Sequence, residues 1–138
     1  DLAYGLTKQL GEEINQYFAR QKGLQALSMR FTLVVDDLAR VVEHSERMGS
    51  IPDLWSYVDI RDAAQACRLG IEAEGLGAEA FFISANDTVH RTSTIELVRQ
   101  HFPEAEIRQG LEGNNSCFSI EKARKLLGYE PKHTWREL

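Results

Sequence analysis

Apolar residues recur at helical spacing over the first 22 positions of the chain. The recurring residues are Leu6, Leu10, Ile14, Tyr17 and Phe18. A spacing of three or four residues places them on one face of a helix, and in an isolated domain such a face would belong to the core. The Lys22-Gly23 pair predicts the end of this helix, because glycine is favoured in the left-handed conformation after a last turn.

Two continuous apolar runs predict buried strands. Residues 24–35 are mostly apolar or β-branched and lie between Gly23 and the Asp36-Asp37 pair, as is typical of a strand buried on both faces of a parallel sheet. We expect this strand to be central. Residues 80–84 (AFFIS) form a shorter run of the same kind, and residues 55–60 predict another short strand.

Capping residues predict the remaining helices. Asp59 is placed to start one helix, Ser93 and Glu96 form a capping box that opens another, and Ser119 is expected to cap a last one. A further short amphipathic helix is expected within 36–48. Strands and helices therefore alternate along the chain, which indicates an α/β fold.

Size, charge and cysteine usage exclude several classes of protein. With 138 residues, 43% apolar and 27% charged, the chain is expected to form at most one ordinary globular domain. A net charge of −5 without a basic cluster argues against a nucleic-acid partner and against an anionic membrane. No apolar run has the length of a membrane span, and Cys67 and Cys117 lack a CxxC spacing, so we expect reduced thiols in a cytoplasmic protein.

One pair of residues combines spacing with chemistry. Tyr4 and Lys8, in the pentapeptide YGLTK, are one helical turn apart and emerge on the same face. A cation held beside a phenol favours the phenolate, which is the form that can act as a general base. From these residues alone, an exposed helical turn with a solvated lysine is the favoured interpretation.

Other catalytic constellations find no support in the sequence. The four histidines, at positions 44, 90, 101 and 133, share no metal-ligand spacing, so we expect no metal site. No serine stands in a GxSxG turn, which argues against a serine hydrolase.

Three stretches resemble one known family in the same order. YGLTKQLGEEINQYF, an apolar strand ending in SMRF, and WSYVDIRDAAQACRLGIEA resemble the carboxy-terminal half of the extended short-chain dehydrogenase/reductase family of NAD-dependent sugar epimerases and dehydratases. The resemblance implies the carboxy-terminal part of a Rossmann-like parallel sheet (about 1–35) and a small α/β substrate-binding lobe (about 36–138). Because the chain opens within a helix and no glycine-rich turn is present, we expect a piece without the amino-terminal dinucleotide-binding half, inactive by itself.

The resemblance also implies roles for individual residues. Tyr4 corresponds to the base that takes a proton from a substrate hydroxyl during hydride transfer, and Lys8 to the residue that holds the nicotinamide ribose of NAD or NADP. Leu33 and Val34 stand where the family contacts the cofactor and the substrate, although the family usually has an Asn and a Pro there. This departure leaves the identity of the small-molecule substrate open.

Nucleotide-sugar members of the family bind the diphosphate with arginines. The family has one such arginine just before the motif that YVDIRD resembles and another ahead of the last helix. At the first of these positions this chain has Trp55, and at the second it has LEGNNS, without an arginine. Arg91 and Arg108 are candidates to replace them, although a surface charge is the favoured interpretation of each. The resemblance further implies a homodimer through the first helix. The competing hypothesis is a non-catalytic domain that keeps the fold and binds a ligand or a partner.

Overall fold

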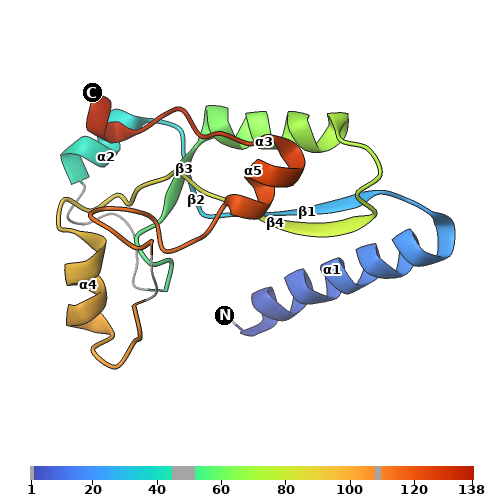
Figure 1. Ribbon diagram of the computed structural model, residues 1–138, viewed down its shortest axis with the longest axis horizontal. Coiled ribbons are helices and arrows are strands. Elements are labelled where there is room, and N and C mark those ends of the chain that lie inside the picture. Colours follow the sequence, from blue (N-terminus) through green and yellow to red (C-terminus); the bar gives the residue numbers. More distant parts are fainter. Residues whose placement is uncertain (1, 45–51, 108–109) are drawn as a thin grey trace.

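The computed structural model describes residues 2–44, 52–107 and 110–138 (Figure 1). The elements along the chain are α1 (Leu2–Lys22), β1 (Ala26–Phe31), β2 (Leu33–Val35), α2 (Leu38–His44), β3 (Tyr57–Asp59), α3 (Ile60–Glu72), β4 (Ala78–Ile83), α4 (Thr94–His101), α5 (Glu121–Leu127) and the 3₁₀ helix η1 (Trp135–Glu137). None of the helices in these ranges is both long enough and apolar enough to cross a bilayer.

The strands form two parallel pairs. β1 pairs with β4, in a register that joins Ala26 to Ala78 and Phe31 to Ile83. β2 pairs with β3, in a register that joins Leu33 to Tyr57. Parallel strands connected through helices confirm the α/β class that the sequence indicated.

The expectation of one central strand over 24–35 is wrong. The run divides at Thr32 into β1 and β2, which pair with different partners. No residue of β1 is fully buried, and the side chain of Phe31 is 40% exposed. The reason is that β1 has a single strand neighbour, β4, among the described residues. Its other edge is therefore not paired with a strand, and β1 is not a central strand.

Helix α1 covers one face of the β1–β4 pair through polar contacts (Figure 1). Asn15 Nδ2 donates a hydrogen bond of 3.0 Å to Ser28 Oγ. Arg30 donates two hydrogen bonds to the Glu12 carboxylate, from Nε at 2.7 Å and from Nη2 at 2.6 Å. Since side chains alternate along a strand, Ser28 and Arg30 face α1 together.

Helix α3 covers the opposite face of the same strands. Leu27 and Met29 lie against Gly70 of this helix. α5 also packs against β4, and one of the two cores lies beneath α3 and α5. The second core joins α2, α4 and η1, and its buried residues include Val35, Val41, Trp55, Tyr57, Val89, Leu97 and Trp135.

The apolar face of α1 is not buried within the described chain. Leu6, Leu10 and Ile14 are between 51% and 56% exposed. The partly buried positions of this helix include Glu12 and Asn15, which contact the sheet. The expectation of a buried stripe therefore fails within one copy of the chain, because the polar side of the helix is the side that docks.

Three of the predicted helix boundaries are confirmed. Asp59 caps α3 by accepting a 2.8 Å hydrogen bond from the Arg61 backbone N–H, and Ser93 caps α4. Gly23 follows α1 with a φ of 64°. The prediction for Ser119 is displaced by one position: Ile120 is the N-cap of α5, and the Ser119 hydroxyl accepts a 3.4 Å hydrogen bond from the Glu121 N–H.

Gly128, which ends α5 with a φ of 69°, gives a testable prediction. Gly128→Ala should lower the free energy of unfolding by roughly 1 kcal/mol, because a Cβ is strained in the left-handed region. Gly11→Ala is the matched control: no atom lies within 4 Å of the added Cβ inside α1, and we expect a gain of about 0.5–1 kcal/mol. Urea unfolding measures both, and a neutral Gly128→Ala would contradict the capping role.

Candidate functional site

Helix α1 brings Tyr4 and Lys8 together. Lys8 Nζ lies 5.1 Å from the centroid of the Tyr4 ring, so the ammonium stands over the aromatic face. Tyr4 is 64% exposed, and its phenol is therefore accessible from solvent. The contact follows from the four-residue spacing on a helix and places a cation over the face of the aromatic ring.

Leu33 and Val34 lie on β2 with exposed side chains. Their exposed fractions are 39% and 46%, which is high for apolar residues in a strand. They are available for contact with a ligand or another part of a protein. Their cofactor role stays a prediction.

Trp55 is part of the core rather than of an open surface. Its side chain is 4% exposed, and its ring centroid lies 5.6 Å from that of His101. The backbone at Leu54 and Trp55 is left-handed, with φ values of 48° and 56°, a strained conformation for such side chains. The substrate role of Trp55 stays a prediction. Only a few per cent of the Trp55 surface is accessible to a ligand.

Of the two candidate arginines, the structure describes Arg91. The guanidinium of Arg91 lies 5.7 Å from the ring centroid of Trp135, and its Nη2 donates a 3.3 Å hydrogen bond to the Val42 carbonyl. Arg91 is therefore engaged by the protein itself. Arg108 lies outside the described residues, and the roles of both arginines stay predictions.

The described part of the structure contains a pocket that the sequence did not predict. It has a volume of about 870 Å³. Ala85 and Asn86, which directly follow β4, contribute to it. Its other lining residues include Leu54, Val98, Phe102, Glu106, Ile107, Leu111, Asn115, Ser116, Cys117, Phe118, Ser119, Ile120, Glu121 and Arg124. The sequence signal that could have indicated this pocket is Asn86, a polar residue shortly after a predicted strand. Ligands bind outside the carboxyl ends of parallel strands, where such a residue lies.

Arg124 of α5 is the cationic side chain among the described lining residues. Its Nη1 donates to Glu121 Oε1 at 2.8 Å, its Nε to Glu130 Oε1 at 3.0 Å, and its Nη2 to Asn86 Oδ1 at 2.6 Å. The hydrogen bond with Glu121, followed by the charge of Glu130, raises the pKa of Arg124 above its usual value. The guanidinium is therefore permanently charged and directed at partners from three segments.

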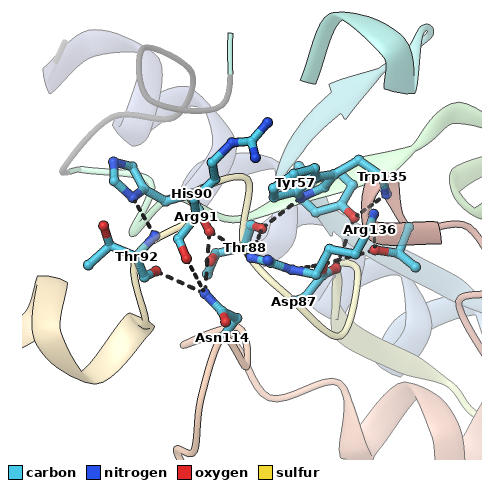
Figure 2. Close-up of polar contacts among 10 residues, drawn as sticks. Tyr57, Asp87, Thr88, His90, Arg91, Thr92, Asn114, Trp135 and Arg136 are labelled. Carbon is cyan, nitrogen blue, oxygen red and sulfur yellow. Dashed lines mark hydrogen bonds and ion pairs between the residues drawn. The ribbon is translucent and has the colours of Figure 1, made fainter. Parts of the chain in front are cut away.

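A second polar cluster holds the end of the chain against the loop after β4 (Figure 2). The Tyr57 hydroxyl donates a 2.9 Å hydrogen bond to Asp87 Oδ1, and Arg136 Nε lies 2.8 Å from Asp87 Oδ2. Burial raises the pKa of Tyr57, and the Asp87 charge raises it further, so the phenol stays neutral and donates. Trp135 Nε1 donates a 3.0 Å hydrogen bond to the Thr88 carbonyl. These contacts hold the tail in a folded conformation and have a structural role.

No protein-family model and no curated protein matches the sequence. Among solved structures, the chain is similar to UDP-N-acetylglucosamine 4-epimerase from Bacillus cereus, with 18% identity and a TM-score of 0.61 over 96% of this chain and 48% of that enzyme. It is also similar to a UDP-galactose 4-epimerase, with 23% identity and a TM-score of 0.58 over 97% of this chain and 49% of the other.

A third similar structure contains ligands. It is UDP-glucuronic acid 4-epimerase from Bacillus cereus in complex with UDP-glucuronic acid and NAD, with 16% identity and a TM-score of 0.59 over 97% of this chain and 49% of that enzyme. The chain spans about half the length of these enzymes. It therefore shares the α/β fold of about half of a UDP-sugar 4-epimerase.

Proposed function

We propose that the chain is the catalytic-helix and substrate-lobe half of an NAD-dependent epimerase, dehydratase or reductase. In this proposal the substrate is sugar-like or bears a hydroxyl group. The observation that carries it is the Lys8 ammonium, 5.1 Å from the Tyr4 ring centroid, on an exposed helix of a fold shared with sugar epimerases. Residues 1–35 would supply the catalytic helix and strand, and residues 36–138 the substrate lobe.

The proposed chemistry is a proton transfer coupled to hydride transfer. Tyr4 would act as the general base that takes the proton of a substrate hydroxyl, and the Lys8 ammonium would donate hydrogen bonds to ribose hydroxyls. When bound, NAD would supply the acceptor for the hydride that leaves the neighbouring carbon. The assignment is tested by the turnover of Tyr4 and Lys8 variants in the whole protein.

The residues present fit one part of the cofactor. The exposed Tyr4 phenol and the Lys8 ammonium are suited to a nicotinamide ribose, and the exposed side chains of Leu33 and Val34 offer an apolar surface. No glycine-rich turn in the sequence is suited to a pyrophosphate, which needs backbone N–H groups at a helix N-terminus. The proposal therefore assigns pyrophosphate binding to the amino-terminal half of a longer protein.

This division predicts the behaviour of the 138-residue chain alone. Titration of the chain with NAD should give no measurable heat of binding, because the pyrophosphate accounts for much of the binding in such sites. A dehydrogenase with known NAD affinity, titrated under the same conditions, checks the sensitivity. Micromolar binding by the chain would show that the cofactor site has been misplaced.

The proposal includes a homodimer through α1. Leu6, Leu10, Ile14 and Phe18 form an exposed apolar stripe, and such surfaces are disfavoured in monomers. We expect light scattering to give the dimer mass, and Leu10→Glu to give the monomer mass across a dilution series. Gln9→Glu adds the same charge beside the stripe and should leave the dimer intact. A monomer at every concentration would contradict this interface.

A further inference from the structure

Arg30 of β1 binds helix α1 through a bidentate ion pair. Its Nε donates a hydrogen bond of 2.7 Å to Glu12 Oε1, and its Nη2 donates one of 2.6 Å to Glu12 Oε2. The hydrogen bond from Arg30 lowers the pKa of the Glu12 carboxyl below its usual value, so the carboxylate is ionised at neutral pH. Two parallel hydrogen bonds between planar groups fix the direction of a contact as well as its length.

The ion pair also involves the second strand of the sheet. The Arg30 guanidinium lies 5.4 Å from the ring centroid of Phe82 on β4, a cation–π contact. The side chains of Glu12 and Arg30 are 23% and 48% exposed, so the pair is partly shielded from water. This shielding, the second contact and the bidentate geometry distinguish it from an isolated surface ion pair, which contributes little.

Directional contacts matter for α1 because none of its residues is fully buried. The described polar contacts of this helix with β1 include the Glu12 ion pair and the 3.0 Å hydrogen bond from Asn15 to Ser28. Without the ion pair, a tilt of about 10° around Asn15 would move Tyr4, about 16 Å along the helix axis, by about 3 Å. A displacement of about 1 Å can lower a catalysed rate by roughly 10²-fold.

We propose that Arg30 is a positioning residue, whose contact with Glu12 holds α1 in the orientation that catalysis requires. The reacting groups of the proposed function, Lys8 and Tyr4, lie on this helix one and two turns before Glu12. Arg30 therefore acts through the helix rather than on the substrate. The inference rests on the proposed function for the identity of the catalytic pair and goes beyond it by assigning a role to a residue of β1.

The orientation of α1 can be measured without turnover. Nitroxide labels are attached to Gly5→Cys on α1 and Lys125→Cys on α5 in the whole protein, with its other cysteines replaced by serine. No atom lies within 4 Å of a Cβ added at Gly5, and Lys125 is exposed. Double electron–electron resonance should show the distance distribution shifted or broadened by about 3 Å or more in Arg30→Met. An unchanged distribution in Arg30→Met would overturn the proposal.

Turnover of the whole protein separates positioning from stability. Arg30→Met should lower kcat about 10- to 100-fold and change KM less than about threefold, because the proposed function assigns substrate binding to residues 36–138. Arg30→Lys keeps the charge and loses the bidentate geometry, so kcat should fall by about three- to tenfold. A role in stability alone would leave kcat unchanged at a temperature where the variants stay folded. An unchanged kcat in Arg30→Met, while Tyr4→Phe is inactive, would overturn the proposal.

A double variant tests whether the two side chains act as one unit. Glu12→Gln should lower kcat as much as Arg30→Met, and the combination of both should lose little more, because each removes the same contact. Multiplied losses in the double variant would contradict the proposal.

The matched control is Arg68→Lys, because Arg68 forms a 2.6 Å ion pair with Glu72 within α3. We expect kcat and the label distances to stay unchanged in this variant, and a loss equal to that of Arg30→Lys would contradict a specific role of Arg30. Full activity of Tyr4→Phe would overturn the proposed function and with it the catalytic part of this inference. The label distances would still show whether Arg30 orients α1, so the two failures can be distinguished.

Discussion

Replacing Tyr4 by phenylalanine is expected to lower turnover of the whole protein by about 10²- to 10⁴-fold, the contribution typical of a general base. The substitution removes only the phenolic oxygen. Because Tyr4 is 64% exposed and α1 has no buried residues, unfolding by urea should be nearly unchanged. The measurement is the initial rate of product formation from the substrate, followed by chromatography, because an epimerase or a dehydratase regenerates its NAD in every turnover. A rate near that of the unaltered protein would rule out Tyr4 as the base.

Lys8→Met should produce a loss of similar size, because it keeps most of the aliphatic stem and removes the ammonium that lies over the Tyr4 ring. Tyr17→Phe is the matched control for the tyrosine: it removes the same oxygen from a 56% exposed residue of the same helix. Lys22→Met is the corresponding control for the lysine. Equal losses in the controls would indicate an effect on the helix as a whole rather than on a catalytic pair.

Trp135→Ala is expected to have the largest effect on stability, a loss of about 3–5 kcal/mol in the free energy of unfolding. The indole is 5% exposed within a core and donates to the Thr88 carbonyl at 3.0 Å. Arg136 lies over its ring, 4.4 Å from the centroid. Truncation would leave a cavity and remove one of two donors to the Thr88 carbonyl, which also accepts a 3.3 Å hydrogen bond from Arg136 Nη2. Urea unfolding followed by circular dichroism measures the change.

Two variants show whether packing or the hydrogen bond dominates. Trp135→Phe keeps an aromatic ring and loses the N–H donor, and we expect an intermediate loss of about 1–3 kcal/mol. Leu138→Ala, at a residue that is 76% exposed in the same tail, should change stability by less than about 0.5 kcal/mol. A loss below 1 kcal/mol in Trp135→Ala would mean that the tail contributes little to the fold.

Predictions from the sequence succeeded where neighbours in the chain decide the structure. A cap forms between residues two or three apart, as at Asp59 and Ser93, so its signal is complete within a few residues. The same holds for the contact of Tyr4 with Lys8, which the helical period alone brings about. The α/β class followed from the alternation of such local signals.

The prediction for 24–35 failed because strand pairing depends on distant segments. Arg30 is paired with Phe82, and Leu33 with Tyr57, so the two halves of the run belong to different sheets. The apolar pattern does not specify the partner, since it is the same for one long strand and for two short ones. The exposed stripe of α1 has a similar cause: amphipathicity predicts an apolar face, and docking through Asn15 placed the polar side against the sheet.

Local sequence was sufficient to predict the α-helices, the caps at Asp59 and Ser93, the α/β class and the Tyr4–Lys8 pair, because each rests on contacts within a turn or on short-range periodicity. The pocket, in contrast, depends on contacts between distant segments. Arg124 meets Asn86 across 38 positions of the chain, and the pocket wall combines Leu54 with residues from 85 to 124. Such groups become neighbours only when strands pair and helices pack, so their chemistry appears only in the folded chain.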